Sequence, residues 1–226
     1  MAEPRQIDLE EAIAAASAAR AAVRDLPRGH YGVICADPPW KYTAWSAKGE
    51  GRSASQHYDV MRIEDIKALP VGDLGAKDSV LLLWAINPML PQALDVMDAW
   101  GYTFKTIGFC WTKTTKRSGA WLPKYHFGMG HWARANVEIC LLGSRGKPKR
   151  REKGVPQLIV SNVREHSRKP DEFYPRVERL CFGPYLDLFS RESRPGWNAF
   201  GNEVGKFNRP ELGDGLRAGH HEGAPT

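Results

Sequence analysis

The chain has 226 residues, of which 42% are hydrophobic and 26% are charged, and its formal net charge is +6. This length fits one α/β-sized domain with short extensions, and the composition is that of an ordinary globular protein. The longest uninterrupted apolar run, residues 80–86, is too short to cross a bilayer, and acids interrupt the Ala-rich N-terminal stretch, which argues against a secretory signal. We therefore expect a cytoplasmic protein without a membrane partner.

The predicted elements begin with a helix over residues 7–24, which is rich in Ala and Glu and ends before Pro27. Residues 31–36 (YGVICA) form a short continuous apolar run, as expected of a strand buried on both faces, and residues 79–86 form a second. Between these strands, residues 46–56 are small, polar and glycine-rich, and we expect a mobile loop there.

The second half of the chain continues the same pattern. Residues 87–101 place apolar side chains at helical spacing and end in glycine, so a helix is expected. Residues 169–181 predict another helix, with Pro170 at its first position and Asp171 and Glu172 at the positive end of its dipole. Strand-like patterns occupy residues 102–113, 137–143, 157–163 and 185–189.

Strands that alternate with helices predict an α/β fold, in which a mostly parallel sheet is covered by helices on both faces. Open sheets of this kind bind ligands at the carboxyl ends of their strands. A functional site is therefore expected where the predicted strands end.

The cysteines and histidines predict neither a disulfide framework nor a metal site. The four cysteines are widely separated, and none belongs to a Cys-x-x-Cys pair, so we interpret them as reduced, buried thiols. They are Cys35, Cys110, Cys140 and Cys181. His220 and His221 are neighbours without other spaced ligands, which is weak support for metal binding.

Positive charge is concentrated in three segments. Residues 144–154 carry six basic residues and one acid, and residues 112–119 and 163–169 carry further cations. One such run is most often a solvated loop, but three in a small domain favour a polyanionic partner, DNA or RNA. The candidate phosphate contacts are Lys113, Lys116, Arg117, Lys147, Lys149, Arg150 and Arg151.

The tetrapeptide Asp37-Pro38-Pro39-Trp40 follows the first buried strand and therefore stands at an expected ligand site. The two prolines fix φ and remove two backbone donors, so we expect the nearby carbonyls to have few local partners. Together with the Asp37 carboxylate they would form a cluster of acceptors, and Trp40 would offer a flat apolar face.

An exocyclic amine on an aromatic base would suit this cluster. Its N–H bonds need acceptors, and stacking its ring on an aromatic side chain is worth roughly 1–3 kcal/mol. Hydrogen bonds to a carboxylate and a carbonyl would free the nitrogen lone pair and stabilise the positive charge that develops as it attacks. The alternative is that Asp37 caps a turn and Trp40 fills the core. However, a chance Asp-Pro-Pro-Trp is expected in well under roughly one in a thousand chains of this length.

At these residues the sequence resembles the S-adenosyl-L-methionine-dependent amino-group methyltransferases, whose signature is Asp/Asn-Pro-Pro-aromatic. It resembles more narrowly the adenine-N6 methyltransferase family typified by the catalytic subunit of the eukaryotic mRNA m6A writer (the MT-A-seventy family), with its bacterial and phage members. Residues 36–40, 128–146, 166–180 and 187–204 carry the resemblance, in the order of the family. It implies a Rossmann-like methyltransferase fold in which the catalytic motif precedes the cofactor segments.

The resemblance also implies roles for individual residues. The tetrapeptide would hold the target amine beside the methyl donor, so Asp37, Pro38, Pro39 and Trp40 would be catalytic, with Asp37 also against the cofactor. Lys169 of the Lys-Pro-Asp-Glu motif would reach the cofactor's carboxylate, which agrees with its place before a predicted helix. The other implied cofactor residues are Asp187, Leu188, Phe189, Arg191, Ser193, Asn202 and Glu203.

Some positions differ from the family pattern or have two interpretations. Ser190 stands where many relatives have glycine, and residues 192–196 (ESRPG) are shorter and differently charged, so Ser193 would replace a usual contact. Tyr58 resembles the tyrosine of a loop that covers the target base, although a tyrosine at such a place is commonly packing. Trp84 would line the substrate site or, more simply, fill the core.

We therefore expect an S-adenosyl-L-methionine-dependent methyltransferase that acts on N6 of adenine in DNA, on a flipped or single-stranded base. DNA is favoured over RNA because no separate RNA-binding module is visible and compact members of the family are typically bacterial or phage DNA enzymes. The alternatives are an RNA adenine-N6 enzyme, a DNA cytosine-N4 enzyme and a non-catalytic nucleic-acid-binding partner subunit. A glutamine methyltransferase is less favoured, because those proteins resemble an Asn-Pro-Pro-Tyr version.

The expected organisation has three parts: a helical extension over residues 1–29, a methyltransferase domain over residues 30–204 and a flexible tail over residues 205–226. A homodimer, or a heterodimer with a related subunit, would be compatible with this organisation. The resemblance places the protein in the cytoplasm of a bacterium or among phage-encoded proteins.

Overall fold

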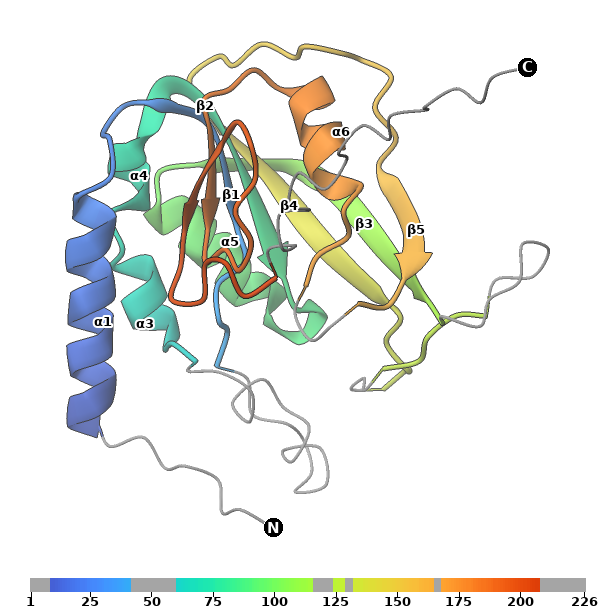
Figure 1. Ribbon diagram of the computed structural model, residues 1–226, viewed down its shortest axis with the longest axis horizontal. Helices are drawn as coiled ribbons and strands as arrows, with labels where there is room; N and C mark the ends of the chain where they lie inside the picture. The colour runs from blue at the N-terminus through green and yellow to red at the C-terminus, as the bar shows by residue number, and fades with distance from the viewer. Residues whose placement is uncertain (1–8, 42–59, 116–123, 129–131, 165–167, 208–226) are drawn as a thin grey trace, which may run out of the picture.

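The computed structural model describes residues 9–41, 60–115, 124–128, 132–164 and 168–207 (Figure 1). Within these ranges, a seven-stranded sheet has the order β5-β3-β4-β2-β1-β6-β7. Its strands are β1 (Tyr31–Ala36), β2 (Gly75–Ala85), β3 (Thr103–Thr114), β4 (Val137–Arg145), β5 (Leu158–Asn162), β6 (Tyr185–Leu188) and β7 (Trp197–Phe200). The helices are α1 (Leu9–Arg24), α3 (Ile63–Lys67), α4 (Val71–Leu74), the 3-10 turn η2 (Asn87–Met89), α5 (Leu90–Ala99) and α6 (Phe173–Leu180).

The sheet is mostly parallel, with one reversed strand. The pairs β1–β2, β1–β6, β6–β7 and β3–β5 are parallel, whereas β4 runs antiparallel to both β2 and β3. Ile139 near the start of β4 therefore lies opposite Ala85 at the end of β2, and Arg145 at the end of β4 lies opposite Ser79 near the start of β2. This reversal decides which side chains share the functional edge of the sheet.

Alternating side chains of the central strands enter two hydrophobic clusters, one on each face of the sheet. Ile34 and Ala36 of β1 pack into a cluster that also contains residues of α1, α3, α4 and α5. Val33 and Cys35 pack into a second cluster with the buried residues of α6. Figure 1 accordingly shows α6 set apart from α1, α3 and α4. Because helices cover both faces, the central strands are apolar without alternation, as the sequence predicted.

The predicted α/β class and the mostly parallel sheet are confirmed, and every strand predicted from the sequence is present. The helix predicted over residues 87–101 is divided into η2 and α5, because Pro91 occupies the first turn of a new helix. The elements α3, α4 and β7 were not predicted from the sequence. These elements are five, four and four residues long, which is too short to display a hydrophobic period.

The predicted start of the last helix was wrong. Helix α6 begins at Phe173 rather than at residue 169, so Pro170 and Asp171 lie ahead of it and Glu172 is its N-cap residue. Pro175 is the third residue of the helix, where a backbone N–H has no partner within the helix, and it therefore costs no hydrogen bond. The segment that precedes α6 therefore is not helical, and it places Lys169 at the edge of the sheet beside Asp37.

Several predictions fall outside the described residues: Tyr58, Lys116, Arg117, the loop at 46–56, the first residues of the N-terminal helix and most of the tail from residue 205. Among the helices that the structure does describe, none has the length and apolar character needed to cross a membrane.

Candidate active site

Three parallel strands end side by side and bring the predicted catalytic and cofactor segments together. The register pairs Ala36 at the end of β1 with Leu188 at the end of β6, and Leu188 with Phe200 at the end of β7. The backbone N–H of Asp37 donates to the carbonyl oxygen of Leu188 at 3.4 Å. Segments that are about 150 residues apart in the sequence therefore meet beside Asp37.

Two further strands add charged side chains to the same edge. Because β4 is antiparallel, Glu138 near its start lies with the ends of the parallel strands, opposite Trp111 of β3. Lys113, two residues further along β3, forms an ion pair with Oε1 of Glu138. The sequence predicted Lys113 as a phosphate contact, and the structure places its ammonium in this internal pair, 4.6 Å from the centre of the Trp111 ring.

Lys169 links the two carboxylates of this edge. Its Nζ lies 2.7 Å from Oδ2 of Asp37 and 3.3 Å from Oε2 of Glu138, and only 11% of its side chain is exposed. Lys113, Glu138, Lys169 and Asp37 thus form a chain of alternating charge, which we call the charge chain. Glu138 was not singled out in the sequence, where it is one acid within a predicted strand.

The charge chain sets the protonation of its members. Burial raises the pKa of Glu138, but Lys169 and Lys113 outweigh it and lower that pKa to about 2. For Asp37, burial raises the pKa above its usual value, and Lys169 opposes this without cancelling it. Although burial alone would lower it, the two carboxylates raise the pKa of Lys169. The structure therefore holds a permanent cation against a carboxylate that protonates more readily than an ordinary aspartate.

The backbone after Asp37 is fixed by more partners than the sequence suggested. The carbonyl oxygen of Pro38 accepts from the N–H of Trp40 at 2.8 Å, and that of Pro39 accepts from the N–H of Met61 at 2.8 Å. Each carbonyl keeps a second lone pair, so each can still accept one further hydrogen bond.

Trp40 does not offer the open stacking face that was expected, and Trp84 fills the core, which was the simpler of its two interpretations. Trp40 is 5% exposed, packs in the cluster with α3 and α5, and donates its indole N–H to the carbonyl oxygen of Trp84 at 3.1 Å. Trp84 is 3% exposed and packs against Phe173 with ring centres 5.0 Å apart. The expectation of a stacking surface on Trp40 is wrong, because the ring turns inward and anchors the Asp-Pro-Pro turn to β2.

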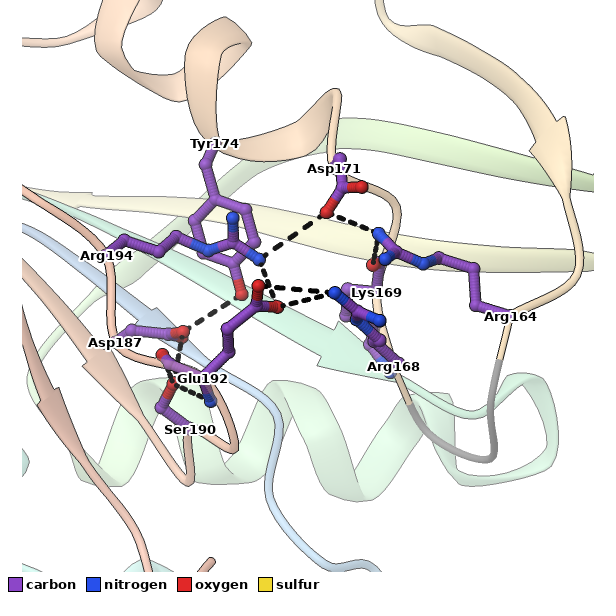
Figure 2. A network of polar contacts seen from close by, with 9 residues as sticks. All are labelled: Arg164, Arg168, Lys169, Asp171, Tyr174, Asp187, Ser190, Glu192 and Arg194. Atoms are coloured by element: carbon purple, nitrogen blue, oxygen red, sulfur yellow. Dashed lines mark hydrogen bonds and ion pairs between the residues drawn. The ribbon is translucent and has the colours of Figure 1, made fainter. Parts of the chain in front are cut away.

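A polar network ties the segment before α6 to the segment after β6 (Figure 2). The carboxylate of Glu192 lies 3.2 Å from Arg168 and 2.8 Å from Arg194, whose guanidinium in turn lies 3.8 Å from the centre of the Tyr174 ring. Asp171 pairs with Arg164 and lies 3.7 Å from Arg194. The sequence signal for this network was the unusual ESRPG segment, which supplies both Glu192 and Arg194.

Asp187 is the buried centre of the same network. It is 7% exposed, and its Oδ2 accepts from the Tyr174 hydroxyl at 2.9 Å and from the Ser190 hydroxyl at 2.8 Å. Burial raises its pKa to about 6 against the effect of these two hydrogen bonds. Its contacts within the protein are those of a residue that supports the strand end, and Leu188, at 1% exposure, is likewise interior.

The remaining predicted cofactor residues lie at the ends of β6 and β7. Phe189 has a φ of 63°, a left-handed conformation that non-glycine residues adopt mainly at constrained sites. Arg191 pairs with Glu203, with Nε and Oε2 3.0 Å apart. Ser193 and Asn202 are exposed. The structure thus brings Phe189, Arg191 and Glu203 to the edge that Asp37 occupies.

The other predicted phosphate contacts lie elsewhere. Lys147, Lys149, Arg150 and Arg151 follow the end of β4, which is the edge opposite Asp37 because β4 is reversed. Arg145 lies six positions after Ile139 in β4, so this loop starts about 20 Å from the catalytic edge at about 3.3 Å per residue. In Figure 1 it crosses the top of the molecule, whereas the chain leaves β1 at the bottom. The structure therefore does not bring these four residues to the edge of the sheet that Asp37 occupies.

The chemistry available at this edge is that of a hydrogen-bond acceptor. Lys169 engages Oδ2 of Asp37, which leaves Oδ1 and the carbonyl of Pro38 able to accept N–H donors from a ligand. Among the described residues, no group of three or more His, Cys, Asp or Glu side chains is placed to hold a metal ion. The arrangement suits a ligand amine and a reaction that builds positive charge on it.

Comparisons with known proteins agree with this geometry. Residues 31–203 match the family model described as MT-A70. The chain is 28% identical to the Type II methyltransferase M.MunI of a Mycoplasma species, over 84% of this chain and 85% of that protein. It is 32% identical to a putative N(6)-adenosine-methyltransferase MT-A70-like protein of Medicago truncatula, over 84% of this chain and 29% of that protein. It is 29% identical to the human N(6)-adenosine-methyltransferase catalytic subunit METTL3, over 78% of this chain and 28% of that protein.

The family match includes every strand of the sheet and both ends of the site, from Asp37 through Lys169 to Glu203. The chain spans most of the length of M.MunI but less than a third of the two eukaryotic relatives. In the two longer relatives, the similarity is therefore confined to one segment of the protein. This chain belongs to the MT-A70 family of N6-adenine methyltransferases.

Proposed function

We propose that this protein transfers a methyl group from S-adenosyl-L-methionine to N6 of adenine in DNA, with Asp37 as the central catalytic residue. The observation that carries the proposal is the Asp37–Lys169 pair, 2.7 Å apart at the carboxyl edge of the sheet and followed by two prolines. In this pair, one carboxylate oxygen of Asp37 is bound to Lys169, and the other can accept a hydrogen bond from a ligand.

The choice of DNA rests on a relative that this chain matches over most of the length of both proteins. M.MunI is a type II methyltransferase, and this chain covers 85% of it, whereas the eukaryotic N(6)-adenosine-methyltransferases contain much additional sequence. The proposal includes a Rossmann-like methyltransferase fold in which the catalytic motif precedes the cofactor segments. It also includes residues 30–204 as the catalytic domain.

The MT-A70 family uses S-adenosyl-L-methionine, and the residues at this edge fit that cofactor. The carboxylate of the cofactor needs a cation. Lys169 uses two of its three N–H donors on Asp37 and Glu138, so one donor remains for that carboxylate. Its amine and ribose hydroxyls need acceptors, which Glu203 and the exposed Asn202 supply. When bound, the cofactor supplies an electrophilic methyl group on a sulfonium.

The chain's own contribution to the reaction is to orient the adenine amine and stabilise its charge. Oδ1 of Asp37 accepts one N–H of the amine, and the free lone pair of the Pro38 carbonyl accepts the other. Both contacts strengthen as N6 becomes positive, which is binding that favours the transition state. The extra proton on the methylated nitrogen then leaves to the Asp37 carboxylate, which accepts the hydrogen bond from that nitrogen and whose pKa is raised by burial.

The proposal also covers the cellular location of the enzyme and its association with a second subunit. A cytoplasmic location in a bacterium is supported by the bacterial origin of M.MunI and by the four free thiols. Association with a second copy or a related subunit is supported by Leu158 and Val160 on the edge strand β5, which are 53% and 46% exposed. Light scattering of the purified protein measures that association directly.

The decisive experiment is transfer of labelled methyl groups to matched DNA and RNA oligonucleotides, followed by digestion and nucleoside identification. We expect N6-methyladenine in DNA. The variant Asp37→Ala should lose activity by about a hundredfold or more, as when one preorganised partner of a developing charge is removed. Its affinities for S-adenosyl-L-methionine and DNA should largely persist, because other residues make those contacts.

The control is Asp95→Asn on α5, an exposed carboxylate that should keep full activity. Methylation of RNA alone would favour the RNA alternative, and N4-methylcytosine would show that the site reads an amine on a different base. DNA binding without any methyl transfer would favour a non-catalytic subunit. Full activity in Asp37→Ala would refute the assigned site.

A further inference from the structure

The edge of the sheet opposite Asp37 carries a concentrated basic surface. It is formed by Lys77 near the start of β2 and by Lys147, Lys149, Arg150 and Arg151 after β4, all of them exposed. We call these five residues the distal basic face. The parallel strands begin at this edge, so it shares no residue with the site described above.

The charges of the distal basic face are mostly uncompensated. Among the described residues, Lys77, Lys147, Lys149 and Arg150 form no ion pair; of the two nearest acids in sequence, Asp78 adds one negative charge beside them and Glu152 pairs elsewhere. Oδ1 of Asp78 accepts the backbone N–H of Lys147 at 2.7 Å, and Glu152 pairs with Arg179 at 2.9 Å. A surface of this kind attracts a polyanion.

The backbone that carries these cations is held in place. Gly146, with a φ of 64°, lies so close to residues 77 and 78 that a Cβ would stand 2.4 Å from the carbonyl oxygen of Lys77. Arg150 forms a β-bridge with Cys181, and the N–H of Arg151 donates to the carbonyl oxygen of Leu180 at 2.9 Å. The face is therefore fixed to both β2 and α6, which lowers the entropy lost when it binds.

A shallow pocket of about 270 Å³ opens within this face. Lys147 and Lys149 line it together with His30, Asp78 and Phe182. Phe182 is 55% exposed, and the guanidinium of Arg151 lies 6.0 Å from the centre of its ring. Two ammonium groups beside an exposed ring suit a phosphate and its attached sugar.

We propose that the distal basic face is a second DNA-binding surface that holds the phosphate backbone away from the target base. The inference rests on the proposed function, because the polyanion that a DNA methyltransferase meets is its own substrate. The face lies about 20 Å along the strands from the catalytic edge, at the opposite edge of the sheet. It would bind DNA whether or not an adenine occupies the site at Asp37.

The test compares two matched double variants with the unaltered protein. Lys147→Gln/Lys149→Gln removes two charges from the face, and Arg20→Gln/Lys67→Gln removes two exposed charges from α1 and α3. Affinity for a 30-base-pair G·C duplex without adenine is measured by fluorescence anisotropy over a range of salt concentrations. Because this probe offers no target base, the result does not depend on methyl transfer.

We expect the Lys147/Lys149 variant to bind about tenfold more weakly and the magnitude of its salt slope to fall by about two, one per lost phosphate contact. The Arg20/Lys67 control should change neither quantity. Lys147→Glu/Lys149→Glu should weaken binding further, while circular dichroism confirms that all variants are folded.

Unchanged affinity and salt slope in both face variants would overturn the inference, and so would a loss seen with RNA but not with DNA. Failure of the proposed function is a separate result. A protein that binds the duplex through this face but methylates no DNA would contradict the assigned reaction and leave the second surface in place.

Discussion

The most informative residue in the structure is Lys169, because its environment explains how a partly buried carboxylate can serve an amine. Its ammonium is shared between Asp37 and Glu138, and Lys113 holds the far side of Glu138. Burial raises the pKa of Asp37, the cation offsets part of this rise, and Glu138 adds to it. Two neighbours of Asp37 thus act on the same pKa in opposite directions.

This opposition predicts the acidic limb of the pH–rate profile. The limb should follow Asp37, since activity is lost as the pH falls through its raised pKa and its carboxylate becomes protonated. Lys169→Met removes the stabilising cation and should move the limb upward by about one to three pH units. Glu138→Gln removes a repelling charge and should move it downward.

The measurement is kcat as a function of pH for the two variants and for Lys169→Arg. Lys169→Arg retains the charge and should hold the limb close to its original position. If both neutral variants shift the limb in the same direction, or neither shifts it, the limb does not report Asp37.

Asp187 illustrates a second consequence of burial at the residue scale. Its pKa is raised from 3.8 to about 6, so the folded protein binds its proton more tightly than the unfolded chain does. By linkage, the stability that this group contributes is fully present below pH 3.8 and is lost as the pH rises through about 6. The hydrogen bonds from Tyr174 and Ser190 limit this loss at neutral pH.

At the scale of elements, the ends of β6 and β7 are the most tightly constrained part of the site. The N–H of Ser190 donates to the carbonyl oxygen of Phe200 at 3.0 Å, so the segment after β6 passes directly over the end of β7. Gly201 occurs at this crossing because a Cβ there would stand 2.4 Å from the carbonyl oxygen of Ser190. The three atoms nearest such a Cβ all belong to the backbone, which cannot rotate away as a side chain can.

Gly201→Ala should therefore separate the two strand ends that carry Arg191 and Glu203. We expect it to lower the free energy of unfolding by about 1–3 kcal/mol, as overpacking commonly does, and to raise the KM for S-adenosyl-L-methionine. The matched control is Gly154→Ala, where a Cβ meets no atom within 4 Å. Urea unfolding and initial-rate kinetics measure the two effects, and an unchanged unfolding midpoint in Gly201→Ala would contradict the packing argument.

At the scale of the whole molecule, the N-terminal helix is more than an extension. Val23 in the last turns of α1 is 1% exposed and belongs to the cluster that covers one face of the sheet, with Ala19 packed against it. Residues that the sequence assigned to an extension over 1–29 thus help to close the main hydrophobic core. The hydrophobic core contains residues from both sides of the predicted domain boundary at residue 30.

Val23→Ala should consequently destabilise the whole protein rather than release a local helix. We expect a loss of about 1–3 kcal/mol, from two buried methyl groups and the cavity left behind. Exposed Arg20 on the same helix provides the control, since Arg20→Ala should be nearly neutral. In urea unfolding, the midpoint should shift with one cooperative transition, and a separate early transition would show that α1 is independent of the core.

The sequence by itself determined the class of sheet, the strand that leads to Asp37 and the Asp-Pro-Pro-Trp motif, because each is written in adjacent residues with a recognisable apolar run or spacing. Only the tertiary structure decided that β4 is reversed. That reversal brings Glu138 to the edge that holds Asp37 and Lys113 and carries Lys147 and Lys149 to the opposite edge. Only the folded chain shows that Trp40 turns inward and that Lys169 joins two carboxylates. Strand direction and side-chain partners depend on contacts between residues far apart in sequence, and no local pattern records those contacts.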